Sequence, residues 1–335
     1  MSFRVRPATA ADLQALYDMA KLTGGGFTNL PADRAVLEDK LLRSTAALMR
    51  EDAAQPDELF VMVLENAATG EIRGTAQLFT RVGQRWPFYS YRRNTVTQHS
   101  RELDRTFRAE MLTLVTDLEG ASEIGGLFLH PAERAAGLGL LLARSRYLFV
   151  AMHRARFADR ILAELRGIID ERGGSPFWDG IAGRFFGMSF QEADHLNAVR
   201  GTQFIADLMP KHPIYTAMLS DTARGVIGLP HPSGRAAMRM LEAEGFACEG
   251  YVDIFDGGPT MTARTDRVAS VAAARRATVA GVSDRGTGAL VATGRLEGFR
   301  CCLGEVGLND GVTVGAAAAA LLQVGAGDEV WWAPR

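Results

Sequence analysis

A glycine-bearing junction between two apolar runs, "HPAERAAGLG" over residues 130–139, constrains this sequence more than any other segment. It follows the strand-like "SEIGGLFLH" and precedes the long apolar run "LLLARSRYLFVAM". Each glycine near the start of a helix costs about 1 kcal/mol relative to alanine, which indicates a need for bare backbone there. A strand, Arg134-x-x-Gly137-x-Gly139 and a helix place free N–H groups at a helix N-terminus, a favourable site for an anion.

The residue types of this junction suit a phosphate. Arg134 supplies a fork of N–H donors, and Gly137 and Gly139, with Leu138 between them, let a phosphate approach the backbone. The pattern is short, however, and the chain contains 36 glycines, so chance alone supplies about one such match. A plain tight turn from strand to helix is the alternative interpretation.

The whole chain has the composition of an ordinary globular protein. Its 335 residues suffice for one elaborated domain or two smaller ones, and 47% are hydrophobic against 23% charged. Lys and Arg total 37 against 39 for Asp and Glu, so we expect no nucleic-acid or membrane partner. No apolar run approaches the roughly 20 residues of a membrane span, and the start enters a strand and helix pattern directly. We therefore expect a cytoplasmic protein.

Hydrophobic periodicity predicts an α+β chain. The predicted strands cover residues 3–9, 59–66, 72–82, 122–130 and 247–259. The predicted helices cover residues 9–23, 34–50, 137–165 and 233–246. Residues 84–119 are aromatic and polar without a clear period.

The domain organisation follows from these segments and from a change in composition. We predict a main domain over residues 1–265, interrupted by a mostly helical insertion at about residues 155–228. From residue 266 to residue 335 the sequence is rich in alanine, valine and glycine, which indicates a small C-terminal α+β subdomain. Cys248, Cys301 and Cys302 form neither a metal-binding spacing nor an even disulfide set, so we predict no metal site.

The junction resembles the acyl-CoA N-acyltransferase (GNAT) superfamily, whose members bind the CoA pyrophosphate on such a loop after their fourth strand. Downstream, "AAMRMLEAEGF" followed by "YVDIFD" is similar to the later helix, turn and strand of that superfamily. Four longer strings resemble the arginine N-succinyltransferase family: "LTGGGFTNLPAD", "RGIIDERGGSPFWDGIAGRFFGMSF", "LMPKHPIY" and "YVDIFDGGPT". This resemblance covers residues 3–268.

The resemblance implies a GNAT-like fold, a mixed sheet flanked by helices, elaborated by the insertion and the C-terminal subdomain. It implies transfer of succinyl from succinyl-CoA to the α-amine of L-arginine, giving N2-succinyl-L-arginine and CoA, within arginine catabolism. The amine would attack directly, with succinyl-CoA as cosubstrate and no permanently bound cofactor. Some members also accept ornithine, and the sequence leaves both substrates open. A homodimer and a heteromer with a paralogous subunit are both open.

The resemblance also assigns the proton donor to the histidine of a His-Pro pair, here His231 in "GLPHPSGR". An imidazole near neutral pKa suits proton transfer to a thiolate or from an ammonium. By residue type alone, His130 and His212, which also precede prolines, are competitors.

The strand before the junction is the predicted place of the CoA arm. Gly125 and Gly126 favour a β-bulge, and Leu127 and Leu129 offer their backbone to the pantetheine. Glycines that merely fit beneath an aromatic side chain are the alternative interpretation.

The amino-acid substrate needs partners for a cation and for a carboxylate. The candidates for the cation are Asp170, Glu171, Asp253 and Asp256, and those for the carboxylate are Arg166 and Arg184. The triple glycine Gly24–Gly26 is a further candidate near the acceptor.

Two rival functions remain at this point. One is an acyl-CoA transferase with another acyl group or amine, and the other is a non-catalytic acyl-CoA-binding subunit of a heteromer. Retention of both the glycine loop and His231 favours the enzyme, because a pure binding subunit has no need of the histidine.

Overall fold

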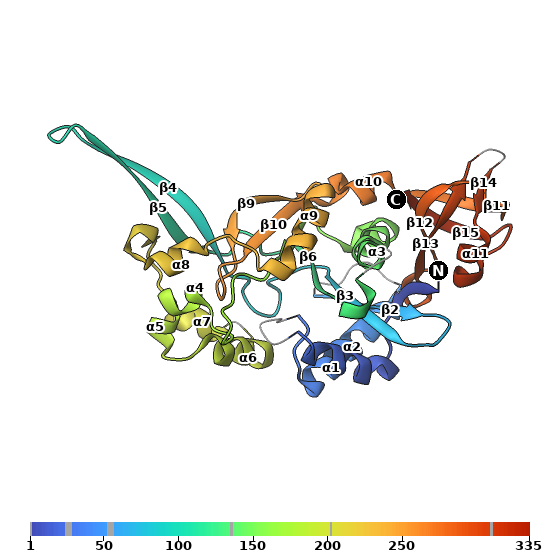
Figure 1. Cartoon of the computed structure of the whole chain (residues 1–335), viewed down its shortest axis with the longest axis horizontal. Coiled ribbons are helices and arrows are strands. Elements are labelled where there is room, and N and C mark those ends of the chain that lie inside the picture. Colours follow the sequence, from blue (N-terminus) through green and yellow to red (C-terminus); the bar gives the residue numbers. More distant parts are fainter. Residues whose placement is uncertain (1, 24–28, 52–56, 135–136, 202, 309–310) are drawn as a thin grey trace.

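The computed structural model of the chain describes residues 2–23, 29–51, 57–134, 137–201, 203–308 and 311–335 (Figure 1). The strands of the main sheet and its extension are β1 (Phe3–Pro7), β2 (Leu59–Asn66), β3 (Ile72–Phe79), β4 (Ser90–Ser100), β5 (Arg105–Val115), β6 (Ser122–Leu129), β7 (Arg160–Glu164), β8 (Ile214–Tyr215), β9 (Ala247–Val252) and β10 (Pro259–Arg264). The strands of the C-terminal part are β11 (Arg275–Val282), β12 (Thr287–Thr293), β13 (Arg300–Gly307), β14 (Val312–Val314) and β15 (Glu329–Pro334).

The helices fall into three groups along the chain. They are α1 (Leu13–Lys21), α2 (Arg34–Leu48) and α3 (Leu138–Met152), then α4 (Pro176–Gly180), α5 (Gly183–Phe186), α6 (Phe190–Arg200), α7 (Gln203–Leu208) and α8 (Asp221–Gly225), and finally α9 (Arg235–Ala243), α10 (Ala269–Ala273) and α11 (Ala316–Leu322). None of the helices in the described part of the chain is long and apolar enough to cross a membrane.

The sheet is covered by helices on both faces, and β2 shows why. Its continuous apolar run places successive side chains on opposite faces, so that both faces are buried. The side chains in the core with α1 and α2 are Leu59, Val61 and Val63, whereas those in the core with α3 are Phe60, Met62 and Leu64.

Seven strands form the main sheet in the order β1-β2-β3-β6-β7-β10-β9. Every neighbouring pair is antiparallel except β6 and β7, which run parallel on either side of the crossover helix α3. The mixed sheet, its flanking helices and the additional C-terminal sheet confirm the fold class expected from the sequence.

One predicted helix is too long. We expected the helix after the glycine junction to continue to residue 165, but α3 ends at Met152 and residues 160–164 form strand β7. His153 ends the helix with φ −124°, outside the helical region. Ile161 and Leu162 are both fully buried, and a short strand buried on both faces has no period that distinguishes it from a helix.

The segment without a clear period forms a long antiparallel hairpin. β4 and β5 pair over their full length, from Ser90 with Val115 to Ser100 with Arg105. Figure 1 shows this hairpin extending away from the body of the molecule. Most side chains of its outer half are exposed on both faces, so the apolar alternation by which a strand is recognised is missing.

Helices α4–α8 pack beside the base of this hairpin. Their aromatic core includes Phe177 and Trp178, which are fully buried, and it joins Tyr91 of β4. Trp178 stacks on Phe255 with ring centroids 5.6 Å apart.

The C-terminal strands form a small sheet with its own core. Val279, Val291 and Leu322 are among its buried residues, and α11 packs against it. This sheet joins the main one where β13 pairs with β1, with Cys301 opposite Val5. Cys301 and Cys302 are buried and Cys248 is exposed.

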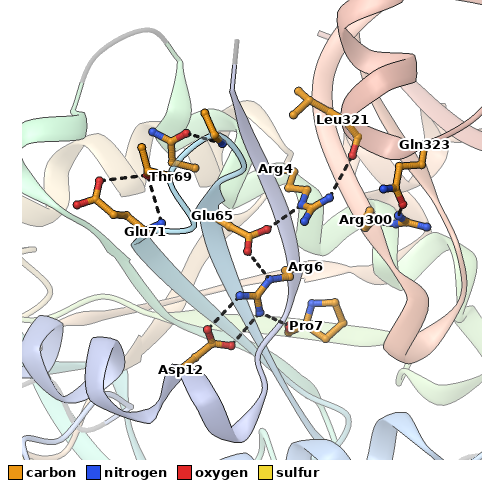
Figure 2. A network of polar contacts seen from close by, with 12 residues as sticks. Arg4, Arg6, Pro7, Asp12, Glu65, Thr69, Glu71, Arg300, Leu321 and Gln323 are labelled. Atoms are coloured by element: carbon orange, nitrogen blue, oxygen red, sulfur yellow. Dashed lines mark hydrogen bonds and ion pairs between the residues drawn. The ribbon is translucent and has the colours of Figure 1, made fainter.

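A network of arginines and carboxylates holds β1 against α1 and β2, as Figure 2 shows. Arg6 donates to both carboxylate oxygens of Asp12, at 2.8 and 3.0 Å, and pairs with Glu65 at 3.2 Å. Arg4 donates to Glu65 at 2.7 Å and reaches the carbonyl oxygen of Leu321 at 3.4 Å. Burial alone would raise the pKa of Asp12, but hydrogen bonds from Arg6 and Thr9 together lower it below its ordinary value.

We predict that Asp12→Asn lowers the free energy of unfolding by about 2 kcal/mol near pH 7, because Arg6 loses one of its two carboxylate partners and keeps only Glu65. The loss should shrink as the pH falls below the ordinary Asp pKa of 3.8 towards the lowered folded value, where wild-type Asp12 is protonated too. Urea unfolding of both proteins measures the difference. Glu71→Gln, on the exposed turn in Figure 2, is the control and should change little.

Candidate active site

One cavity of about 1330 Å³ lies among β6, the start of α3, the end of β7 and the start of α9. Most residues predicted as site residues from the sequence line it: Leu127, Leu129, Arg134, Gly137, Gly139 and His231. The side chain of Leu138 is instead buried in the core, although this residue begins α3. The predicted loop, strand and histidine therefore meet at one cavity.

β6 carries a β-bulge at its two glycines, as predicted. The register with β3 shifts between Gln77, which pairs with Gly125, and Thr75, which pairs with Phe128. Gly126 has φ +56°, and a Cβ on it would lie 2.8 Å from the Gln77 side chain. Both the backbone angle and the close approach therefore require glycine at this position.

β6 and β7 separate just before this bulge. They pair only at Ser122 and Glu123 of β6, and along its other side β7 pairs with β10 over its whole length. The stretch of β6 that carries Leu127 and Leu129 therefore has no described strand partner on the β7 side. Its backbone groups on that side are available to a ligand that lies between the strands.

The start of α3 lies at one end of the cavity. Gly137 caps the helix in the left-handed conformation, with φ +78°. Among the described residues, a Cβ on Gly139 would have only the Leu129 side chain within reach, at 3.7 Å, so these residues leave room beside the turn. Arg134 is exposed and forms no ion pair or side-chain hydrogen bond with any residue that the structure describes. Free N–H groups, a helix dipole and an unpaired guanidinium together favour an anion here.

His231 is held by its neighbours at the other side of the cavity. Its backbone N–H donates to the carbonyl oxygen of Arg166 at 2.8 Å, and a short turn over Pro232–Gly234 follows it. Nδ1 lies 2.7 Å from the hydroxyl of Ser233 and 3.3 Å from its backbone nitrogen. Nε2 therefore remains the ring nitrogen available to a ligand. Burial, with the Arg166 charge, lowers the pKa of His231 below its ordinary value of 6.5.

The competing histidines lie elsewhere. His130 has the same local geometry as His231, but its Nδ1 contacts Arg73 at 3.1 Å and caps a turn outside the residues that line the cavity. His212 is exposed, also outside that set. Among the His-Pro pairs, the cavity therefore selects His231.

Carboxylates gather where the end of β7 meets the turn between β9 and β10. Glu164, Asp253 and Asp256 line the cavity there. Burial raises the pKa of each, and the charge of Asp253 raises the pKa values of Glu164 and Asp256 further. Asp256 is fixed by the backbone N–H groups of Gly167 and Gly258, at 2.7 and 2.8 Å. A cationic ligand group would relieve the mutual repulsion of these carboxylates.

The remaining substrate-binding candidates divide clearly. Arg166 lines the cavity, and its Nε is buried without a hydrogen-bond partner among the described residues. Asp170, Glu171 and Arg184 are exposed and lie outside the cavity lining. Residues Gly24–Gly26 lie outside the described part of the chain.

A buried polar network beneath the bulge was not predicted from the sequence. Lys40 of α2 donates to the carbonyl oxygen of Asn29 at 2.8 Å and to the side-chain oxygen of Gln77 at 3.1 Å. Asn29 in turn donates to Glu123 at 2.9 Å. This network fixes the Gln77 side chain against which Gly126 packs. Lys40 gives no local signal, because in the sequence it resembles any charged residue on an amphipathic helix.

Comparisons with known proteins identify one family over nearly the whole length of the chain. A family model described as the arginine N-succinyltransferase beta subunit matches residues 3–270, and a model for the C-terminal domain of that subunit matches residues 275–334. The arginine N-succinyltransferase subunit beta of Pseudomonas aeruginosa is 45% identical over 268 residues, which are 80% of this chain and 78% of that protein.

Two further relatives extend this result. The arginine N-succinyltransferase of Citrobacter koseri is 43% identical over 271 residues, 81% of this chain and 78% of that protein. The solved structure of arginine/ornithine succinyltransferase subunit AI from Pseudomonas aeruginosa has a TM-score of 0.91 at 34% identity, covering 99% of this chain and 98% of that one. The structural likeness therefore includes both the main sheet and the C-terminal sheet.

Lys40 predicts a pH-dependent stability. Burial lowers its pKa from 10.5 to about 8, although Glu123 acts in the opposite direction. Between these two values the unfolded chain binds a proton at Lys40 that the folded chain does not, so wild-type stability should rise with pH relative to Lys40→Met. Urea unfolding at pH 7.5 and 9.5 tests this. Lys211→Met, at an exposed lysine, is the control, and an equal pH response in both variants would contradict the assignment.

Proposed function

The chain belongs to the arginine N-succinyltransferase beta subunit family, and we propose that its cavity transfers succinyl from succinyl-CoA to the α-amine of L-arginine. The products are N2-succinyl-L-arginine and CoA. The observation that supports this best is the continuity of one cavity from the helix start at Gly137, along the open edge of β6, to His231. The anion site matches the phosphate groups of an acyl-CoA, and the extended backbone edge matches its pantetheine arm. The proton-transfer group then lies where the thioester carbon would react.

The donor occupies the part of the cavity built by β6 and α3. The pyrophosphate binds the backbone N–H groups at the start of α3 and the guanidinium of Arg134. The pantetheine arm lies along Leu127 and Leu129, in the gap where β6 and β7 separate. Backbone groups there hydrogen-bond the arm and polarise the thioester carbonyl near the bulge.

The acceptor occupies the part with the carboxylates. Asp253, Asp256 and Glu164 bind the guanidinium of arginine, whose charge offsets the repulsion among them. The guanidinium of Arg166, which lines the cavity, binds a substrate carboxylate. This division places the cationic end of the amino acid away from the phosphates and leaves the α-amine near His231.

His231 moves the proton that the reaction requires. As the amine forms its C–N bond and the C–S bond breaks, the nitrogen loses a proton and the departing sulfur gains one. The lowered pKa keeps His231 neutral before the reaction, so that it accepts a proton from the amine and then donates to the thiolate. For this step the neutral ring carries its proton on Nδ1, which donates to the Ser233 hydroxyl, so that Nε2 accepts the amine proton and then passes it to the thiolate.

A second candidate acceptor is ornithine, because a relative with 34% identity over nearly the whole chain is described as an arginine/ornithine succinyltransferase subunit. The deciding experiment measures thiol release from succinyl-CoA with arginine, ornithine, lysine and agmatine, with mass spectrometry of the products. We expect arginine to give the N2-succinyl product at the highest kcat/KM. Acylation at the guanidinium, or no turnover with any of these amines, would contradict the proposal, and the latter would favour a non-catalytic acyl-CoA-binding subunit.

We predict that His231→Ala lowers kcat by roughly 10²–10⁴-fold, the usual range for general acid–base catalysis, with KM values little changed. The acid limb of the wild-type rate profile should lie below pH 6.5 and disappear in the variant. His130→Ala is a matched control, because His130 has the same backbone conformation before a proline and lies outside the cavity lining. A raised KM for succinyl-CoA at unchanged kcat would instead indicate a packing role.

We further propose that the chain works within a multi-subunit assembly, since its family is described as a beta subunit. The hairpin β4–β5 supports this proposal. Leu103 and Phe107, near its tip, are 75% and 49% exposed. An isolated two-stranded ribbon is marginally stable in water, so a hairpin of this length is expected to pack on another subunit. A homodimer and a heteromer both fit this argument.

Replacing both Leu103 and Phe107 with aspartate should reduce the assembly to smaller species without unfolding the chain, because both side chains are exposed. Sedimentation velocity gives the mass, and thermal melting checks the fold. Leu22→Asp, at an exposed leucine outside the hairpin, is the control. An unchanged mass in the double variant would exclude the hairpin as an interface.

A further inference from the structure

The guanidinium of Arg335, at the end of the C-terminal sheet, lies beside the start of α3. Arg335 follows β15, and its side chain lines the same cavity as Gly137 and Arg134. A Cβ on Gly137 would lie 2.7 Å from Nη2 of Arg335, closer than carbon and nitrogen approach without a bond. The positive φ of Gly137 favours glycine there, and the missing side chain leaves the adjoining space to the Arg335 guanidinium.

Contacts on both sides of Arg335 fix its position. Its own backbone N–H donates to the carbonyl oxygen of Gly288 in β12 at 3.0 Å. The carbonyl oxygen of Pro334, one residue earlier, accepts from Arg144 of α3 at 2.8 Å. Arg144 is itself held by Glu244 at 2.9 Å and by Ser270 at 2.7 Å. Arg335 is thus tied both to the C-terminal sheet and to the helix whose start it adjoins.

The charge of Arg335 has no described counterion. Neither Arg335 nor Arg134 forms an ion pair with any residue that the structure describes, whereas the Arg144 beside them is matched by Glu244. Two unmatched guanidinium groups and the positive end of α3 therefore share one end of the cavity. In a chain of net charge −2, such a concentration of positive charge calls for a ligand with more than one negative charge.

We propose that Arg335 binds the phosphate groups of CoA, so that the donor site is completed by the C-terminal sheet. This inference rests on the proposed function, which places an acyl-CoA in the cavity. The planar guanidinium donates two N–H groups to phosphate oxygens, beside the N–H groups at the start of α3 and the guanidinium of Arg134. The C-terminal sheet is then part of the binding site as well as of the fold.

The test compares Arg335→Gln with wild type, using free CoA in calorimetry and succinyl-CoA in steady-state kinetics. We expect the Kd of CoA and the KM of succinyl-CoA to rise about tenfold, with kcat and the KM of the amine unchanged. Arg335→Lys keeps the positive charge but not the two parallel N–H donors, so its Kd for CoA should lie between those of wild type and Arg335→Gln. Arg276→Gln, at an exposed arginine paired with Glu329 in the same sheet, should behave as wild type.

A truncated donor separates phosphate binding from a structural role. Succinyl-pantetheine lacks the nucleotide, so wild type and Arg335→Gln should have equal KM values for it. An unchanged Kd for CoA, or an equal loss with the truncated donor, would overturn the inference. Wild type that binds CoA but acylates no amine would refute the proposed function and leave the CoA measurement on Arg335 valid. Melting curves of both variants confirm that they are folded.

Discussion

The separation of β6 from β7 is the feature on which the rest of the site depends. Two parallel strands normally share a ladder of hydrogen bonds, but here the ladder stops after Glu123, and the bulge at Gly126 bends β6 away. The unpaired edge would be a defect in an ordinary sheet, because buried backbone groups need partners. In the proposed function a substrate that lies between the strands supplies those partners, so that the ligand would complete the sheet.

Charged side chains are buried on both sides of the gap between β6 and β7. Lys40 supports the bulge from beneath and faces Glu123 through Asn29, so that a positive and a negative group share one enclosed site. On the other side of the gap, Glu164, Asp253 and Asp256 stand together with Arg166 nearby. The three carboxylates repel one another, which raises the free energy of this part of the site, and a cationic group placed among them would lower it.

The parts of the site that depend on unusual backbone were predictable from the sequence. Gly126 and Gly137 are required by local geometry, and glycine marks such positions directly. Lys40 and Arg335 were not predictable, because their roles arise from contacts with residues far away in the chain. β7 was mistaken for the end of a helix because burial on both faces removes its period. The hairpin β4–β5 was missed for the opposite reason, because exposure on both faces also removes the alternation of apolar and polar residues.

The pairing of β1 with β13 has a consequence for how the protein is made. Val5 is synthesised well before its partner Cys301, which lies far along the sequence. During synthesis one edge of β1 therefore stays open while β2 already covers the other. An open strand edge on a partly made chain invites pairing with a neighbouring chain. β1 spans only five residues, and a short edge strand offers few backbone groups for such pairing.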